Sequence, residues 1–387
     1  MNVIYLSPHF PENYIAFVAA LYHRGVQVLG IADLPFDHLP EQLKGVLTDY
    51  YQVDNMENYE ELFRAVAFFS FKYGKIDHLD SLNEYWLFTE AKLRTDFNIP
   101  GIQNDTIADM KYKSRMKERF KKAGIRVAEG KVIDDIDSAR EFISKTGFPV
   151  VAKPDIGVGA VNTYKISDEE WLERFFQNKP PEPYIFEEFI SGRIETFDGL
   201  TDKFGNLVYC TGHVYSDGVM EVVNNDRHVY YYSFREIPAD VEEMGMKIFR
   251  EFNLKGRFFH FEFFRTYEGS LIALEVNMRP PGGYTTDMFN FGSDIDIYEQ
   301  WANMVTMNTF GSDFYRKYHV AYVGRKWRFN YKYSTQQIEE MLGQKLVFHN
   351  YISGIFSLAM GNYGYIIRHQ DLDELLKCVN LVHELNE

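Results

Sequence analysis

Apolar residues in the first third of the chain follow two spacings, one typical of buried strands and the other of amphipathic helices. Continuous apolar runs at residues 3–6, 26–31 and 76–79 have the length of short strands. Between them, residues 12–24 and 59–73 carry apolar side chains at helical spacing. Strands that alternate with helices in this way predict a parallel α/β sheet with right-handed crossovers.

The loops after the first and third predicted strands are candidate substrate contacts. Ligands of open α/β sheets bind beyond the carboxyl ends of the strands, which here brings in His9, Phe10, Asn83 and Glu84. Ordinary polar loop positions are the alternative explanation. No G-x-G-x-x-G sequence follows the first strand, so the dinucleotide-binding fingerprint is absent.

A second pattern occupies residues 258–283, with the sequence FFHFEFFRTYEGSLIALEVNMRPPGG. Residues 258–264 and 271–278 are apolar or aromatic runs, and the turn at residues 266–270 carries a glycine that can adopt positive φ. The pattern therefore predicts a hairpin. The polar residues within its two strands are His260, Glu262, Glu275 and Asn277.

The polar positions of this hairpin suggest a metal and phosphate site. Side chains alternate along a strand, so Glu275, Asn277 and Arg279 are predicted to share one face. The opposite face is predicted to hold Ile272, Leu274, Val276 and Met278. Carboxylates within such apolar strands are costly unless paired. Two carboxylates and an amide oxygen suit Mg²⁺ that also keeps water and phosphate oxygens, and the arginine can clamp a phosphoryl group. A half-solvated hairpin is the alternative.

Three stretches in the middle of the chain suit nucleotide binding. Residues 105–124 predict a lysine-rich helix, residues 148–153 (FPVVAK) a strand that ends in lysine, and residues 184–190 (YIFEEFI) another strand. The glycine-bearing loop at residues 154–160 can bring backbone amides to phosphates beside Lys153. This loop lacks the P-loop spacing, and none of the three stretches is specific by itself.

The remaining patterns are less informative about function. Residues 204–223 predict two antiparallel strands, and residues 239–253 and 294–307 predict helices. The loop at residues 280–287 is a candidate contact for the acceptor substrate, because its glycine pair permits close approach of the backbone; a plain turn is the alternative. From about residue 311 a smaller α+β unit is predicted, with strands at residues 318–325, 346–350 and 363–368 and helices at residues 334–342 and 371–386.

Composition excludes several classes of protein. A chain of 387 residues predicts two or three domains. The formal net charge of −15, without a basic stripe, argues against a nucleic-acid binder. Two cysteines without metal or redox spacing make a disulfide framework unexpected. Neither a signal peptide nor an apolar run of membrane-spanning length is recognisable, and we expect a cytoplasmic protein.

The order of the motifs is more specific than any one of them. The stretches KYKSRMKERFKKAGI, VVAKPDIGVGA, FEEFISGRIE and FEFFRTYEGSLIALEVNMRPPGG together resemble the ATP-grasp superfamily. Within it, the chain is similar to carboxylate–amine ligases such as the L-amino acid ligases, a group that also includes biotin carboxylase-like enzymes. The resemblance covers about residues 1–310.

This resemblance implies a mixed α/β and α+β fold. The implied domains are a Rossmann-like N-terminal domain at residues 1–105, an ATP-grasp domain at residues 106–310 and a small α+β C-terminal domain at residues 311–387. The ATP-grasp domain would consist of two subdomains that hold ATP between them, residues 106–190 and residues 191–310, the second carrying the metal site.

The resemblance also implies the cofactors ATP and Mg²⁺, with Mn²⁺ as an alternative ion, and a role for individual residues. Phosphate contacts are implied for Lys113, Lys153, Gly157 and Gly159, with Lys111 and Lys117 as alternatives for the first lysine. Nucleoside contacts are implied for Glu187 with the adenine amino group, for the backbone at Glu188 and Ile190, and for Glu195 with the ribose. The implied metal ligands are Glu262, Glu275 and Asn277. Arg279 and Lys153 are the implied catalytic residues, with Arg279 near the γ-phosphate and the acyl phosphate.

The implied activity is ATP-dependent formation of an amide from a carboxylate and an amine through an acyl phosphate, with release of ADP and phosphate. The expected partners are therefore small molecules, without nucleic acid or membrane, and a homodimer is a further expectation. Two alternatives remain open at this point. One is a carboxyphosphate-forming enzyme of the purine-pathway or carboxylase type, and the other is an ATP-binding module without catalysis.

Overall fold

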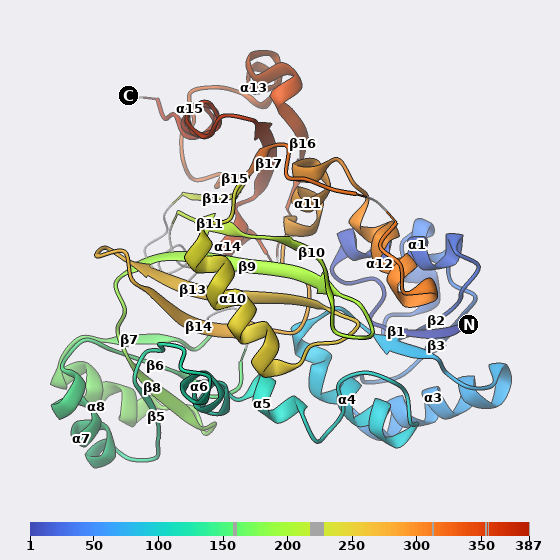
Figure 1. Ribbon diagram of the computed structural model, residues 1–387, viewed down its shortest axis with the longest axis horizontal. Helices are drawn as coiled ribbons and strands as arrows, with labels where there is room; N and C mark the ends of the chain where they lie inside the picture. Colours follow the sequence, from blue (N-terminus) through green and yellow to red (C-terminus); the bar gives the residue numbers. More distant parts are fainter. Residues whose placement is uncertain (158–160, 217–227, 312, 353, 355, 387) are drawn as a thin grey trace.

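The computed structural model describes residues 1–157, 161–216, 228–311, 313–352, 354 and 356–386. Its strands form three sheets, with four, nine and four strands (Figure 1). Gly159 and most of the loop after residue 216 lie outside the described residues. No helix within the described part of the chain is long and apolar enough to cross a membrane.

The N-terminal sheet is parallel, as the alternation of strands and helices predicts. Its strand order is β3-β2-β1-β4, and neighbouring strands pair in parallel register. The strands are β1 (Asn2–Leu6), β2 (Gln27–Ala32), β3 (Asp49–Gln52) and β4 (His78–Asp80). The helices are α1 (Ile15–His23), α2 (Glu41–Lys44), α3 (Tyr59–Tyr73) and α4 (Leu87–Asp96), with single 3₁₀ turns at Glu12–Tyr14, Phe36–His38 and Glu84–Trp86.

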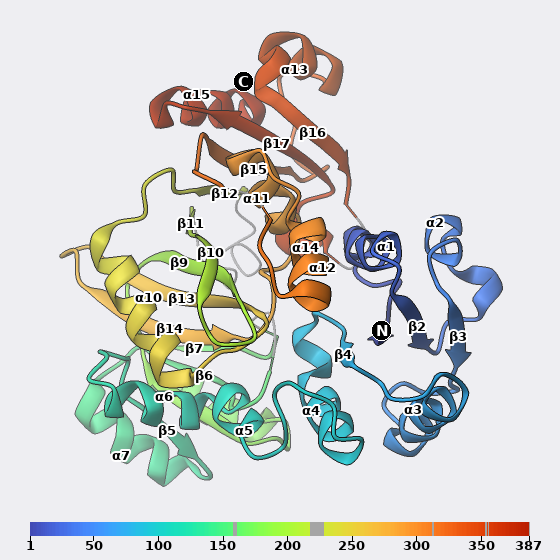
Figure 2. The same cartoon turned by 45° about the vertical axis from the view of Figure 1, so that its right-hand side comes forward.

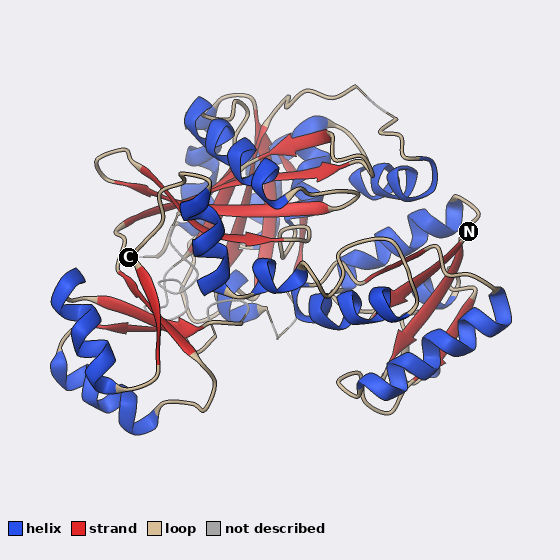
Figure 3. Cartoon of the chain, turned by 60° about the horizontal axis from the view of Figure 1, so that its bottom comes forward, coloured by secondary structure: helices blue, strands red, loops and turns tan. Residues whose placement is uncertain are grey.

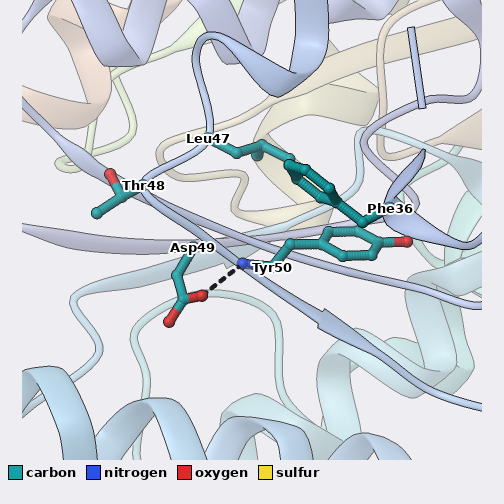
Figure 4. A pocket seen from close by; sticks show the side chains of 5 residues that line it. All are labelled: Phe36, Leu47, Thr48, Asp49 and Tyr50. Carbon is teal, nitrogen blue, oxygen red and sulfur yellow. Dashed lines mark hydrogen bonds between the residues drawn. The ribbon is translucent and has the colours of Figure 1, made fainter. Parts of the chain in front are cut away.

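Strand β3 is absent from the sequence-based prediction. It has only four residues, DYYQ, and lies half-buried at the edge of the sheet, so it lacks the apolar run that marks the other strands. A hollow beside it is lined by Phe36, Leu47, Thr48, Asp49 and Tyr50 (Figure 4). This hollow contains none of the predicted site residues.

The second sheet belongs to a separate small layer, with the strand order β5-β8-β6-β7 and antiparallel pairing throughout. Its strands are β5 (Gly130–Ile133), β6 (Val150–Pro154), β7 (Tyr164–Ile166) and β8 (Tyr184–Glu188). Helices α7 (Ile136–Thr146) and α8 (Glu169–Asn178) pack on it over a common apolar core. Figure 3 shows this unit on the side of the molecule opposite the N-terminal sheet.

The predicted lysine-rich helix is two helices. Helix α5 (Ile107–Lys111) ends at Tyr112, whose backbone is extended (φ −80°, ψ 118°), and α6 (Lys113–Lys122) begins directly after it. The backbone N–H of Lys113 donates to Asp155 O at 2.9 Å instead of continuing the α5 ladder. The break therefore directs Lys111 and Lys113 to different partners.

The large sheet has the order β14-β13-β9-β11-β12-β15-β17-β16, with β10 paired to β9. Helix α10 (Ala239–Phe252) lies across β9, β13 and β14 (Figures 1 and 2). Gly245 allows this close approach, since a Cβ there would lie 2.4 Å from the Phe197 ring. The strands as far as the hairpin are β9 (Gly192–Thr201), β10 (Leu207–Thr211), β11 (His213–Tyr215), β12 (Val229–Ser233), β13 (Phe258–Thr266) and β14 (Leu271–Asn277).

The β13–β14 hairpin contains a β-bulge that corrects the predicted faces. Glu262 lies opposite Glu275, but Phe263 lies opposite Ala273, so Leu274 has no opposite residue. Side-chain alternation therefore changes phase at Leu274. Ala273 packs in the core beneath α10, whereas Ile272 belongs to the opposite face; the prediction that Ile272 and Leu274 share a face with Val276 is wrong.

The C-terminal elements match the predicted strands and helices, but their strands extend the large sheet. Strand β15 pairs with β12, so the nine-stranded sheet continues across the predicted boundary at residue 310. The division into domains remains a prediction. The elements of this part are α11 (Thr285–Ser293), α12 (Ile297–Met307), β15 (His319–Arg325), α13 (Thr335–Leu342), β16 (Leu346–Tyr351), α14 (Ser357–Met360), β17 (Tyr363–His369) and α15 (Leu372–His383), with a 3₁₀ turn at Gly343–Lys345.

Candidate nucleotide and metal site

The three predicted metal ligands lie together where β13 and β14 pair. Glu262 and Glu275 are direct cross-strand neighbours, and Asn277 lies opposite His260. Asn277 Nδ2 is 3.3 Å from Glu262 Oε1 and 3.5 Å from Glu275 Oε1. Like charges directly opposite each other destabilise a sheet unless a cation compensates them. The arrangement therefore has the charge and the oxygen donors of a site for a hard divalent cation.

The protein offers only a few oxygen donors here, which is typical of a metal ion that binds at a nucleotide. No group of three or more His, Cys, Asp and Glu side chains in the described ranges is placed to hold a metal ion. Two carboxylates and one amide leave most coordination positions to phosphate oxygens and water, which is the usual environment of Mg²⁺ at a nucleotide. Burial acts to raise the pKa of Glu262, but the hydrogen bond and the charge of His260 outweigh it, and the pKa lies below its ordinary value.

Of the three lysines considered for the first phosphate contact, Lys113 lies beside Glu275, one of the predicted metal ligands. Its Nζ is 4.0 Å from Glu275 Oε2 and 3.4 Å from Gly157 O. Lys111 instead donates to Glu84 Oε1 at 2.6 Å, and Lys117 donates to Ala128 O at 2.9 Å. Desolvation lowers the pKa of Lys113 despite the Glu275 charge, so this ammonium is held in a largely dry position.

Lys153 also reaches the site, and Glu187 holds it there. Lys153 Nζ is 2.9 Å from Glu187 Oε2, and Lys117 Nζ is 3.1 Å from Glu187 Oε1. Burial acts to raise the pKa of Glu187, but the two lysines lower it to about 2. The carboxylate is thus an ionised bridge between two ammonium groups. It was predicted to accept from an adenine amino group, and this geometry gives it a different set of partners.

The backbone beyond Glu187 is arranged around the link between β8 and β9. The Glu188 N–H donates to Glu129 O at 2.9 Å, and Glu188 Oε1 accepts from Glu129 N at 3.0 Å. These bonds fasten β8 to the start of β5. Ile190 follows β8 and precedes Gly192, where β9 begins, so it lies at the junction of the second sheet and the large sheet.

Glu195 is not brought to the site, which corrects its predicted ribose contact. It lies opposite Phe263 in the sheet and therefore faces α10, whereas Thr196 lies opposite Glu262 and faces the other side of the sheet, with the predicted metal ligands. Its fully buried carboxylate accepts from Arg193 at 2.8 Å and from Arg265 at 2.9 Å. Both oxygens are thus occupied by arginines on the far face of the sheet.

The loop at residues 154–160, predicted to contact phosphates, is joined through Asp155 to the start of α6. Ser114 donates its backbone N–H to Asp155 Oδ1 at 2.8 Å and its hydroxyl to Asp155 Oδ2 at 2.7 Å. Gly157 follows in an exposed position and accepts from Lys113 through its carbonyl. Gly159, the second predicted loop contact, lies outside the described residues.

Arg279 follows the predicted metal ligands and contacts Glu84 in the N-terminal part of the chain. Its Nε is 3.5 Å from Glu84 Oε2, and Nη1 donates to Pro280 O at 2.7 Å. Buried Arg257 donates to Met278 O through Nε at 2.9 Å and Nη2 at 2.6 Å, which fixes the backbone between Asn277 and Arg279. The Glu84 loop, a candidate substrate contact from the sequence, thus lies next to the predicted catalytic arginine.

The loop at residues 280–287 also contacts the N-terminal part of the chain. Asn13 Nδ2 donates to Gly283 O at 2.9 Å, and Tyr14 donates its hydroxyl to Pro281 O at 3.1 Å. Asp287 accepts from Tyr298 at 2.8 Å, and burial raises its pKa to about 6. Phe10, in the loop after β1 that was a candidate substrate contact, stacks on Phe356 with ring centroids 5.5 Å apart.

Two buried residues next to this site were not predicted from the sequence. Asp198 on β9 and His213 on β11 connect to His260, whose Nδ1 is 2.5 Å from Asp198 Oδ1. Burial acts to lower the pKa of His260, but Asp198 and Glu262 raise it to about 9. The sequence indicated the contact between His260 and Glu262, because these two residues share a face in the hairpin pattern. Asp198 was hidden because residues 192–201 lack a strand-like apolar run.

Comparisons with known proteins agree with this fold. No family model matches the chain. An L-arginine-specific L-amino acid ligase of Bacillus subtilis is 26% identical over 242 residues, which are 60% of this chain and 58% of that protein. A C-terminal section of the carbamoyl phosphate synthase large chain of Methanopyrus kandleri is 29% identical over 113 residues, 28% of this chain and 21% of that protein. The chain thus matches less than two thirds of the length of either relative.

Solved structures match over nearly the whole chain. An L-amino acid ligase from Bacillus licheniformis superposes with a TM-score of 0.77 at 14% identity, covering 99% of this chain and 96% of that one. An N5-carboxyaminoimidazole ribonucleotide synthetase in complex with ADP gives a TM-score of 0.72 at 13% identity, covering 99% and 95%. The fold is therefore that of the ATP-grasp enzymes. The chain is similar in fold to these enzymes, and it is similar in sequence to the L-amino acid ligase of Bacillus subtilis.

Proposed function

We propose that the chain is an ATP-dependent carboxylate–amine ligase that forms an amide and releases ADP and phosphate. The observation that carries the proposal is the position of Lys113 beside the pair of opposed glutamates, with its Nζ 4.0 Å from Glu275 Oε2, while the charges of Glu275 and Glu262 also act on Lys153. Arg279 follows two residues after Asn277, where β14 ends, and is the proposed contact of the transferred phosphoryl group. The similarity to an L-amino acid ligase supports the choice of reaction.

Lys113 and Lys153 are the proposed phosphate contacts. Both ammonium groups are nearly buried, with side-chain exposures of 11% and 10%. An ion pair in such a dry position is stronger than it would be in water. Glu187 and Glu275 compensate the two charges in the absence of nucleotide, so phosphates would replace part of an existing electrostatic network. Gly157, and Gly159 beyond the described part, would close the loop over the phosphates.

Glu262, Glu275 and Asn277 would hold Mg²⁺, or Mn²⁺, at the nucleotide. Such an ion neutralises negative charge on the phosphates during transfer. The two carboxylates supply the protein's share of the oxygen ligands, and their direct opposition across the hairpin fixes their spacing. The backbone at Glu188 and Ile190 is proposed to contact the adenine, since these residues lie at the junction between the two sheets.

The proposed reaction has two balanced steps. An oxygen of the substrate carboxylate forms a bond to the γ-phosphorus as the bond to the β–γ bridging oxygen breaks, giving an acyl phosphate and ADP. The amine nitrogen then attacks the acyl carbon, the bond from that carbon to the phosphate oxygen breaks, and the nitrogen loses a proton. Arg279 is proposed to hold the carboxylate and the developing oxyanion.

The Glu84 loop and the loop at residues 280–287 are the proposed walls of the substrate site. Glu84 Oε2 lies 3.5 Å from Arg279 Nε, so a substrate bound at Arg279 would meet both domains. The proposed substrates are a small carboxylate, such as an amino acid, and a small amine. A homodimer and a cytoplasmic location belong to the same proposal.

A carboxyphosphate-forming enzyme is the second candidate, because the sequence also matches carbamoyl phosphate synthase large chains. In that case bicarbonate would take the place of the substrate carboxylate. The two candidates share the nucleotide and metal residues and differ in the carboxylate that stimulates phosphate release.

One experiment separates these candidates. Phosphate release from MgATP is measured with pooled amino acids, with bicarbonate and with neither, in the presence and absence of hydroxylamine, with Glu275→Gln as control. Release that depends on the amino acid pool, with hydroxamate formation, supports the ligase. Release that depends on bicarbonate alone supports the second candidate. If ATP binds but no phosphate is released under any of these conditions, both candidate functions are contradicted and an ATP-binding module without catalysis is favoured.

A further inference from the structure

A continuous chain of buried side chains leads to Glu262 from the interior of the large sheet. Asp198 Oδ2 is 2.7 Å from His213 Nδ1, and Asp198 Oδ1 is 2.5 Å from His260 Nδ1. His260 Nε2 is in turn 3.1 Å from Glu262 Oε1. Asp198 and His213 are fully buried and His260 is 5% exposed, whereas the side chain of Glu262 at the end of the chain is 20% exposed.

The positions of the hydrogens follow from the partners. Thr196 donates its hydroxyl to Asp198 Oδ2 at 2.7 Å, and the same hydroxyl accepts the backbone N–H of His213 at 2.9 Å. Asp198 therefore receives hydrogen bonds at both oxygens and acts as an acceptor. His260 lies between two carboxylates, so both of its ring nitrogens must donate, one to Asp198 and the other to Glu262.

We propose that His260 is a positioning residue that fixes the Glu262 carboxylate for metal binding, and that Asp198, braced by Thr196 and His213, holds His260 in place. The proposal rests on the proposed function, because it takes Glu262 as a metal ligand. A glutamate has three rotatable side-chain bonds. Fixing one of its oxygens before the cation arrives removes part of the entropic cost of binding, and partners of this kind orient ligands in many metal sites.

A matched pair of substitutions separates positioning from general packing. The amide nitrogen of asparagine reaches about as far as Nδ1 of histidine, and that of glutamine about as far as Nε2. His260→Asn therefore keeps a donor toward Asp198 and loses the donor toward Glu262. His260→Gln keeps a donor toward Glu262 and loses the one toward Asp198. A merely structural histidine gives no reason for the two variants to differ in metal affinity.

The measurement is the affinity for Mn²⁺ in the presence of a non-hydrolysable ATP analogue, followed by electron paramagnetic resonance, so that no turnover is needed. We expect His260→Asn to weaken Mn²⁺ binding about 10- to 100-fold, the usual cost of losing such a partner. His260→Gln should recover most of that loss. His383→Asn, which removes a histidine that contacts Gly324 O at 3.0 Å in the C-terminal part, should leave the affinity unchanged.

Asp198→Asn provides a second variant if His260→Asn does not fold. It leaves Glu262 and His260 intact but cannot accept from both rings, so we expect weaker Mn²⁺ binding here as well. Equal Mn²⁺ affinity in His260→Asn, His260→Gln and the wild-type protein, or equal losses in both His260 variants, would overturn the positioning role while leaving the proposed function standing. A wild-type protein that binds the analogue but no Mn²⁺ would overturn both.

Discussion

Replacing Glu187 with glutamine tests whether this residue organises the two lysines or contacts adenine directly. The change keeps the shape of the side chain and removes its charge. Lys117 and Lys153, which lie 3.1 and 2.9 Å from its oxygens, would then be buried without their common counter-ion. An adenine contact predicts weaker ATP binding with normal stability. An organising role predicts that stability and ATP binding fall together.

The magnitude follows from the pKa. A carboxyl whose pKa falls from 4.5 to about 2 in this fully buried position is stabilised in its ionised form by about 3 kcal/mol. Removing one partner of a buried ion pair costs roughly 3–5 kcal/mol in other proteins, which agrees with this value. Because the folded-state pKa is lowered, this contribution is fully present above pH 4.5, the unfolded value, and is lost as the pH falls toward 2.

The assay is urea denaturation of the wild-type protein and the variant, with Glu188→Gln as the matched control. Glu188 is partly exposed and accepts one backbone N–H, so its loss should cost only about 1 kcal/mol. Glu187→Gln should cost about 3 kcal/mol at pH 7, and the difference from wild type should fall to about half by pH 3. A Glu187→Gln variant as stable as Glu188→Gln at pH 7 would refute the reasoning.

The remaining predictions concern the other charged groups. Glu275→Gln should abolish metal-dependent turnover while circular dichroism remains that of the wild type; normal activity would remove Glu275 from the metal site. Lys113→Met and Lys153→Met should each weaken ATP binding by calorimetry at least 10-fold, since a charge-assisted hydrogen bond is worth about 1.5–3 kcal/mol, whereas Lys111→Met should leave ATP affinity closer to that of the wild type. If all three lysine variants bind ATP with the same affinity, Lys113 is not the first phosphate contact. Glu195→Gln should lower the melting temperature, because two arginines lose their buried acceptor, without changing ATP affinity; a selective loss of ATP binding would restore the ribose contact.

The sequence predicted most of the fold because its apolar runs are clear. Helix α3 (Tyr59–Tyr73) has the predicted bounds, and the strands of the C-terminal part lie within a residue or two of the predicted ones. Strand β3 was missed because an edge strand of four half-buried residues has no distinctive pattern. The continuity of the large sheet through β12 and β15 was not predicted, because pairing between distant strands leaves no local signal.

Part of the candidate site was predicted because the hairpin has a clear alternating pattern of side chains. Alternation within the hairpin brought Glu275 and Asn277 to one face, and the structure places Glu262 directly opposite Glu275. The bulge at Leu274 was not visible, because it depends on the register of both strands. The face of Glu195 was also hidden, since residues 192–201 carry polar side chains on both faces and alternation could not assign them.

The sequence could not decide which lysine lies at the predicted phosphate site, and the structure was needed for this choice. Helical spacing alone left Lys111, Lys113 and Lys117 as alternatives for the first phosphate contact. The break at Tyr112 separates Lys111 from Lys113, and the contact of Lys117 with Ala128 O turns it toward the interior. A helix break held by a hydrogen bond to Asp155, which lies about forty residues further along the chain, has no signature in the local sequence.

The most direct test of the central claim follows one oxygen atom. The amino acid that stimulates phosphate release is labelled with ¹⁸O in its carboxylate, and the released phosphate is analysed by mass spectrometry. An acyl phosphate intermediate transfers a carboxylate oxygen to phosphorus, so we predict one ¹⁸O atom in each phosphate released with the amide. Unlabelled phosphate would contradict carboxylate activation by phosphorylation, and ¹⁸O in AMP would show adenylation instead.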